Sequence, residues 1–137
     1  MKTKLLSVVL AAVLLLFAFA GCAAENSQEE SEGPMYQKIT AAEAKERMED
    51  NPDAIILDVR TREEYEAGHI EGAVLLPNES IGADLSKELP GLDAEILIYC
   101  RSGNRSAQAA KKLVDLGYTN VFDFGGIIDW PYGTVKK

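Results

Sequence analysis

Two short apolar runs limit the fold of this chain more than any other feature. They are Ala54 to Val59 and Ile96 to Tyr99, and both are rich in isoleucine and leucine. Asn51-Pro52-Asp53 precedes the first run and Pro90-Gly91 precedes the second. Apolar runs of this length, bounded by turn-forming residues, predict buried strands. The first run has the character of a central strand in a parallel sheet.

Helical patterns alternate with these strands. Thr40 and Glu43 have the spacing of a capping box, which predicts a helix from residue 41 to about residue 49. Further helices are expected at 61–67, 81–89 and 106–116, and further strands at 35–39, 73–76 and 121–124. Gly68 is expected to end its helix in a left-handed conformation, and Gly117 to cap the last helix. The alternation predicts an α/β domain with a mainly parallel central sheet flanked by helices, in which ligands bind at the carboxyl ends of the strands.

The N-terminal segment has the pattern of an export signal. Lys2 and Lys4 precede an uncharged run of residues 5–20, which ends at Gly21-Cys22. Sixteen helical residues extend roughly 24 Å, less than the roughly 30 Å hydrocarbon core of a bilayer, which disfavours an uncleaved membrane anchor. An ordinary signal peptide cut near the alanines is the other alternative.

Phe19-Ala20-Gly21-Cys22 resembles the lipobox of bacterial lipoproteins, with Phe19 in place of the usual aliphatic residue. The resemblance implies a signal peptide at residues 1–21, lipidation of Cys22 and an extracytoplasmic protein anchored to a bacterial membrane. Residues 22–34 are polar and acidic and predict a flexible tether, so that the folded domain spans residues 35–133.

Charge and cysteine content exclude several classes of function. The formal net charge is −8, and it becomes −10 without residues 1–21, so a nucleic-acid partner is not expected. Only one histidine is present, and lipidation of Cys22 would leave Cys100 as the one free cysteine. A metal site therefore has almost no candidate ligands, no glycine-rich nucleotide loop occurs, and neither a metal nor another cofactor is expected. A monomer is the default expectation.

The most reactive feature is the cysteine loop Cys100-Arg101-Ser102-Gly103-Asn104-Arg105-Ser106. It lies where the second apolar run gives way to a helix, and such turns direct backbone N–H groups and the positive helix end at an anion. The helix start and the two arginines are expected to lower the pKa of the Cys100 thiol. The alternative is a buried structural cysteine.

Four motifs in order resemble the rhodanese (sulfurtransferase) family. They are Asp58-Val59-Arg60, the stretch from Glu63 to Ala73, the cysteine loop, and Gly125-Gly126-Ile127-Ile128-Asp129-Trp130. The resemblance implies a single-domain rhodanese fold in which Cys100 carries sulfane sulfur as a persulfide. Its partners would be a small anionic donor such as thiosulfate and a thiol or cyanide acceptor.

The resemblance also implies roles for the residues of the cysteine loop. Cys100 would be the nucleophile, while Arg101, Ser102, Gly103, Asn104 and Arg105 would bind the substrate, with Arg101 the favoured donor contact. One of the two arginines could instead pair with a surface carboxylate. Cysteine phosphatases place an arginine six positions after the nucleophile, where this chain has Ser106. A phosphatase or arsenate reductase is therefore disfavoured.

Supporting roles are expected around the loop. Asp58 could orient the loop or cap the helix that follows it, and Arg60 is expected to pair with a glutamate. Ser106 is expected to cap the helix after the loop, and His69 to belong to the scaffold. Gly125, Gly126 and Trp130 are expected to close the core. A further alternative is a lipid-anchored module that binds an anion or senses oxidants through an exposed Cys100 thiol.

Overall fold

The structure is a computed structural model that describes residues 35–82, 89 and 91–137. The predictions for residues 1–34, including lipidation of Cys22, lie outside the described residues. So does most of the helix expected at 81–89. Among the described residues, no helix is both long enough and apolar enough to cross a membrane.

A five-stranded sheet forms the centre of the domain, with all strands parallel in the order β1-β5-β4-β2-β3. The strands are β1 (Gln37–Lys38), β2 (Ile55–Asp58), β3 (Val74–Leu75), β4 (Ile96–Cys100) and β5 (Val121–Gly126). The helices are α2 (Ala41–Asp50), α3 (Arg62–Ala67) and α4 (Asn104–Asp115), with short 3-10 turns at η1 (Asn78–Ser80) and η2 (Ile127–Asp129). The predicted α/β class and parallel sheet are confirmed.

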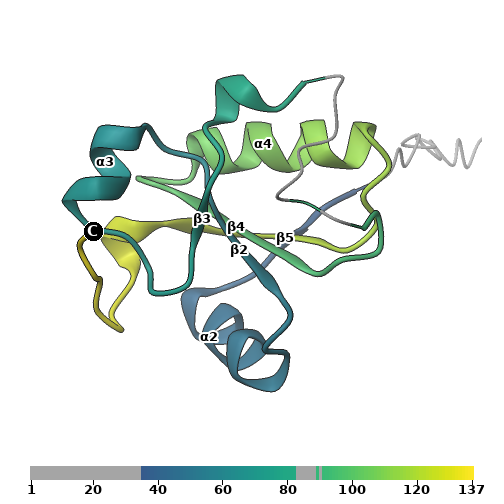
Figure 1. Cartoon of the computed structure of the whole chain (residues 1–137). Coiled ribbons are helices and arrows are strands. Elements are labelled where there is room, and N and C mark those ends of the chain that lie inside the picture. The colour runs from purple at the N-terminus through teal and green to yellow at the C-terminus, as the bar shows by residue number, and fades with distance from the viewer. Residues whose placement is uncertain (1–34, 83–88, 90) are drawn as a thin grey trace, which may run out of the picture. The chain divides into compact units, whose positions relative to one another are not determined.

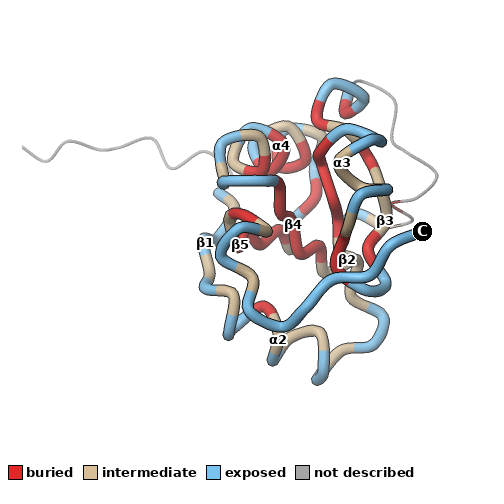
Figure 2. The backbone as a smooth tube through the Cα atoms, turned by 90° about the vertical axis from the view of Figure 1, so that its left-hand side faces the viewer, coloured by how far each residue is buried: buried red, intermediate tan, exposed pale blue. Residues whose placement is uncertain are grey.

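Helices cover both faces of the sheet. Helices α3 and α4 lie on one face and α2 lies on the other (Figure 1). Strand β4 is buried along its whole length, as the red tube in Figure 2 shows. Successive side chains of a strand point to opposite faces. Ile96, Ile98 and Cys100 therefore pack in the core under α4, while Leu97 and Tyr99 pack in the core that includes Ala44 of α2.

Capping sequences define the helix ends. Both Thr40 and Thr61 form complete capping boxes, with Glu43 and Glu64 respectively, so the predicted start of α2 is confirmed. Gly117 follows α4 with φ +102°, and Tyr118 N–H donates to the Leu113 carbonyl at 3.0 Å, as a glycine-terminated helix requires.

The conformation predicted for Gly68 is wrong. Gly68 ends α3, but its φ of 160° is extended backbone rather than left-handed. The chain continues directly into an extended segment, where His69 N–H donates to the Val135 carbonyl at 2.9 Å. This antiparallel contact with the C-terminal segment, which was not expected, accounts for the extended geometry.

The carboxyl ends of the central strands lie at one edge of the sheet because the strands are parallel. Asp58 ends β2, Cys100 ends β4 and Gly126 ends β5. Asp58 pairs with Tyr99 across the ladder, and Cys100 pairs with Gly126. The edge at which a ligand is expected therefore carries the cysteine loop.

Candidate active site

A three-residue turn joins the strand that carries Cys100 to the following helix. Strand β4 ends at Cys100, and α4 begins at Asn104. Gly103 is the N-cap residue with φ +104°, a conformation that favours glycine because it lacks a Cβ. The tight turn directs the Gly103 N–H at the Cys100 side chain.

The predicted helix start at Ser106 is wrong by two residues, so Ser106 is not the N-cap. It occupies the third helical position, where its hydroxyl oxygen lies 3.0 Å from the Gly103 carbonyl oxygen and 3.7 Å from Cys100 Sγ, so that its one proton can be donated to either atom. The first two residues of the helix, Asn104 and Arg105, are polar, so the apolar periodicity in the sequence begins later than the helix itself. Ser106 therefore closes the loop from inside the helix.

Hydrogen bonds dominate the environment of the Cys100 sulfur. Cys100 is only 1% exposed, and the Gly103 N–H donates to Sγ at 3.0 Å. Burial alone would raise the pKa of the thiol, but the N–H and hydroxyl of Ser106 and the N–H groups of Gly103 and Ser102 together lower it below its ordinary value. The lowered pKa agrees with the prediction, and the largest lowering causes are the hydrogen-bond donors of the loop, which were not predicted.

The burial of Cys100 helps to distinguish between a functional thiolate, an oxidant sensor and a structural cysteine. The exposed thiol assumed for the oxidant-sensing module is wrong, because the side chain lies beneath the loop on the α4 face of the sheet. A structural cysteine would also be buried. It would not need an N–H group aimed at its sulfur, and this contact favours a functional thiolate.

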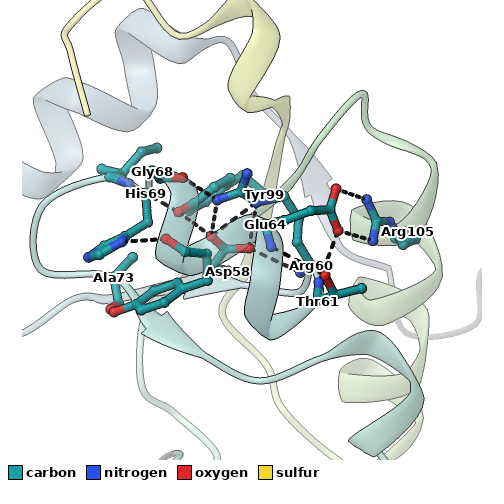
Figure 3. Close-up of polar contacts among 11 residues, drawn as sticks. Asp58, Arg60, Thr61, Glu64, Gly68, His69, Ala73, Tyr99 and Arg105 are labelled. Atoms are coloured by element: carbon teal, nitrogen blue, oxygen red, sulfur yellow. Dashed lines mark hydrogen bonds and ion pairs between the residues drawn. The ribbon is translucent and has the colours of Figure 1, made fainter. Parts of the chain in front are cut away.

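The two loop arginines lie in different environments. Arg101 is exposed, as are Ser102 and Asn104. Arg105 forms a bidentate ion pair with Glu64 of α3, with N–O distances of 2.7 and 2.8 Å (Figure 3). The possibility that one arginine pairs with a surface carboxylate is therefore realised at Arg105.

The end of strand β5 packs closely against the backbone of the cysteine loop. An ideal Cβ on Gly126 would lie 2.3 Å from the Arg101 carbonyl oxygen and 2.7 Å from Ser102 Cα. The Ile128 N–H donates to the same Arg101 carbonyl at 3.3 Å. Gly126 was expected to close the core, and its contact with the loop backbone was not predicted. The paired glycines were a signal of close backbone approach.

A buried ion pair lies beside the loop. Asp58 is fully buried and Arg60 is 5% exposed, and the Arg60 guanidinium donates to both carboxylate oxygens at 2.7–3.1 Å (Figure 3). The Tyr99 hydroxyl donates to Asp58 Oδ2 at 2.6 Å. Burial and the nearby Asp58 carboxylate raise the pKa of Tyr99.

Two predictions for this cluster are corrected. Arg60 pairs with Asp58 rather than with a glutamate, and its guanidinium also donates to the Gly68 carbonyl at 2.7 Å. Asp58 does not cap the following helix, because Thr61 does so.

His69 belongs to the scaffold. Its ring stacks on Tyr65 at a centroid distance of 3.8 Å, and Nδ1 lies 2.8 Å from the Tyr65 carbonyl oxygen. Trp130 packs against Phe124 at 5.5 Å, at the edge of the core on the α2 face. Within residues 35–82, 89 and 91–137, no three His, Cys, Asp or Glu side chains gather in a way that could hold a metal ion.

Comparison with known proteins identifies the family. The model of the rhodanese-like domain family matches residues 40–131. A sulfurtransferase of Allochromatium vinosum is 39% identical over 97 residues, covering 70% of this chain and 89% of that protein. The thiosulfate sulfurtransferase PspE of Escherichia coli is 32% identical over 80 residues, covering 58% and 77% of the two chains.

Solved structures agree with this comparison. The rhodanese-like domain of an Anabaena protein superposes with a TM-score of 0.65 at 30% identity, covering 75% of this chain and 81% of that domain. The matched region contains strands β2 to β5, the helices on both faces of the sheet, and the cysteine loop. The chain belongs to the rhodanese-like domain family.

Proposed function

We propose that the protein is a sulfurtransferase that carries sulfane sulfur as a persulfide on Cys100. The observation that carries the proposal is the 3.0 Å hydrogen bond from the Gly103 N–H to Cys100 Sγ, at the carboxyl end of a central parallel strand. A donor aimed at a buried sulfur stabilises negative charge there, as a thiolate or persulfide requires. The sulfurtransferase names of two relatives support the same chemistry.

In the first half-reaction, the Cys100 thiolate attacks the outer sulfur of thiosulfate. An S–S bond forms between Cys100 and that sulfur, the bond between the two thiosulfate sulfurs breaks, and sulfite leaves with the bonding electron pair. The enzyme is left as a Cys100 persulfide anion, so charge and atoms balance without a redox partner. Because Cys100 is buried, the terminal sulfur of a small donor fits this step better than a bulky centre.

In the second half-reaction, a nucleophilic acceptor attacks the outer persulfide sulfur. Cyanide would become thiocyanate, and a thiolate would become a persulfide, while the electron pair of the broken S–S bond returns to Cys100 as thiolate. Such a mechanism has two chemical steps separated by a covalent intermediate, which predicts ping-pong kinetics.

The loop residues have distinct proposed roles. The N–H groups of Ser102, Gly103 and Ser106 stabilise the sulfur anion, since they lower the pKa of Cys100. Exposed Arg101 is the proposed donor contact, with Ser102 and Asn104 beside it. No general base is assigned, because the hydrogen-bond donors of the loop maintain the thiolate.

Steady-state kinetics test the proposal. Thiosulfate and cyanide should yield sulfite and thiocyanate, with parallel double-reciprocal lines when the two substrates are varied. The Cys100→Ser variant should be inactive while keeping the wild-type circular dichroism spectrum. Turnover of an aryl phosphate ester with no sulfur transfer would contradict the proposal and favour the phosphatase alternative.

We also propose that residues 1–21 are a signal peptide and that lipidated Cys22 anchors the extracytoplasmic domain to a bacterial membrane through the tether 22–34. The apolar run before Gly21-Cys22 supports this proposal. Labelling expressing cells with an alkyne fatty acid should mark the wild-type chain and not the Cys22→Ser variant. Equal labelling of both would contradict it.

A further inference from the structure

The ion pair between Arg105 and Glu64 joins the loop helix to the neighbouring helix. Arg105 is the second residue of α4, and both of its terminal nitrogens donate to the Glu64 carboxylate, at 2.7 and 2.8 Å. Each side chain is 28% exposed, so the pair lies at the surface without being fully solvated. A bidentate arginine–carboxylate pair with this geometry holds the guanidinium in one orientation.

The capping box at the start of α3 holds the Glu64 side chain independently of Arg105. Glu64 is the third residue of α3, and its Oε2 accepts the Thr61 N–H at 3.0 Å while its own N–H donates to Thr61 Oγ1 at 3.3 Å. The Arg105 hydrogen bonds lower the pKa of Glu64 to about 2, so the carboxylate is charged throughout the physiological range. The negative charge beside Arg105 is therefore permanent.

Arg105 of this ion pair also interacts electrostatically with the Cys100 thiolate. Glu64 hydrogen bonding is the main cause of a raised pKa for Arg105, and the charges of the Cys100 thiolate and Glu79 contribute in the same direction. An arginine so close to the nucleophile would otherwise attract an anionic donor. With its charge offset by Glu64, the exposed Arg101 is left as the effective cation of the loop.

On this basis, and resting on the proposed sulfur transfer, we infer that Glu64 is a specificity-determining residue. By occupying Arg105, it weakens binding of doubly charged donors and shifts preference toward singly charged donors, such as organic thiosulfonates and persulfides. A dianion is more sensitive than a monoanion to one added positive charge, because the attraction scales with the product of the charges.

The Glu64→Gln variant tests this inference with two donors. Thiosulfate carries two negative charges and benzenethiosulfonate carries one, and both offer a terminal sulfane sulfur. Glutamine can still accept the Thr61 N–H, since Gln also serves in the capping box. The ratio of kcat/KM for thiosulfate to that for benzenethiosulfonate should rise about fivefold at low salt, through a lower thiosulfate KM, and the gain should shrink at high salt.

The second capping box supplies a matched control. Glu43 caps α2 through the same two contacts with Thr40, at 2.7 and 3.2 Å, on the opposite face of the sheet (Figure 1). It makes no ion pair with an arginine in the part of the chain that the structure describes. Glu43→Gln makes the same change in a capping box as Glu64→Gln does. It should leave the ratio of kcat/KM for thiosulfate to that for benzenethiosulfonate within about twofold of wild type.

The double variant Glu64→Gln/Arg105→Gln separates neutralisation from direct donor binding. Removing both charges should return the donor ratio to within about twofold of wild type. A donor ratio that does not change in Glu64→Gln, or a thiosulfate kcat/KM that falls tenfold or more in the double variant, would overturn the inference. Wild-type protein that transfers no sulfur from either donor would instead contradict the proposed function.

Discussion

The Tyr99 hydroxyl donates a 2.6 Å hydrogen bond to the Asp58 carboxylate and thereby connects β4 to β2 one residue before Cys100. The same hydroxyl accepts the Ile70 N–H at 3.1 Å. Arg60 completes the group by donating to both oxygens of Asp58. The strand that presents Cys100 is therefore anchored by a buried polar cluster on the face opposite its sulfur.

Breaking the buried ion pair should destabilise the domain strongly. Asp58→Asn would leave the Arg60 guanidinium without its carboxylate in a buried site, and such losses cost about 3–5 kcal/mol. The free energy of unfolding from urea titration measures the effect. Lys45→Gln removes an exposed ion pair with Glu49 and should cost less than about 1 kcal/mol. Equal costs for the two variants would show that the cluster is not a structural anchor.

Ser106 should tune the reactivity of the thiol. Ser106→Ala removes the hydroxyl that helps to lower the pKa of Cys100, so the pH profile of iodoacetamide alkylation should move to higher pH. At pH 7 the variant should react about three- to tenfold more slowly, as expected for the loss of one hydrogen bond to an anion. Ala107→Ser, the adjacent position, is a suitable control. An unchanged profile would remove Ser106 from the thiolate environment.

The lowered pKa of Cys100 also predicts how stability depends on pH. The folded state binds the thiol proton less tightly than the unfolded state does, so the contribution of Cys100 to stability is fully present above the unfolded pKa of about 8.5. It is lost as the pH falls through the folded-state pKa. The free energy of unfolding of wild type minus that of Cys100→Ser should therefore increase as pH rises across this window. A difference that decreases with pH would mean that the folded protein favours the thiol.

Gly126 should position the loop by steric contact alone. Its φ is −118°, which any residue can adopt, yet a Cβ there would overlap the Arg101 carbonyl oxygen. Gly126→Ala should push the loop away from β5 and lower kcat/KM by about tenfold to a hundredfold. Alkylation of Cys100 should also shift to higher pH. Gly82→Ala, where no atom lies within 4 Å of the added Cβ, should behave as wild type; equal losses in both variants would contradict the steric account.

Local patterns in the sequence predicted much of this fold. The apolar runs at Ile55 and Ile96 became adjacent central strands, and the Thr40–Glu43 spacing formed the expected capping box. These features depend on residues close together in the chain, whose propensities and hydrogen bonds act over one or two turns. The position of Cys100 at the end of a strand was predicted from the apolar run that precedes it and the helical pattern that follows it.

Long-range contacts were beyond such reasoning. Pairing of Arg105 with Glu64 joins positions 41 residues apart, and pairing of His69 with Val135 depends on the return of the C-terminal segment. The role of Gly126 appears only when β5 packs beside the loop. Burial of Cys100 was also misjudged, because the sequence shows a polar loop but not that its backbone covers the sulfur.

The most direct test of persulfide chemistry is an intact mass measurement. The full chain carrying Cys22→Ser, purified in detergent, leaves Cys100 as its one cysteine. After incubation with thiosulfate it should gain the mass of one sulfur atom and lose it on addition of cyanide, while the same chain with Cys100→Ser should gain nothing. Absence of the adduct with thiosulfate and with other sulfane donors, in protein that is folded, would contradict the assignment of Cys100 as a sulfur carrier.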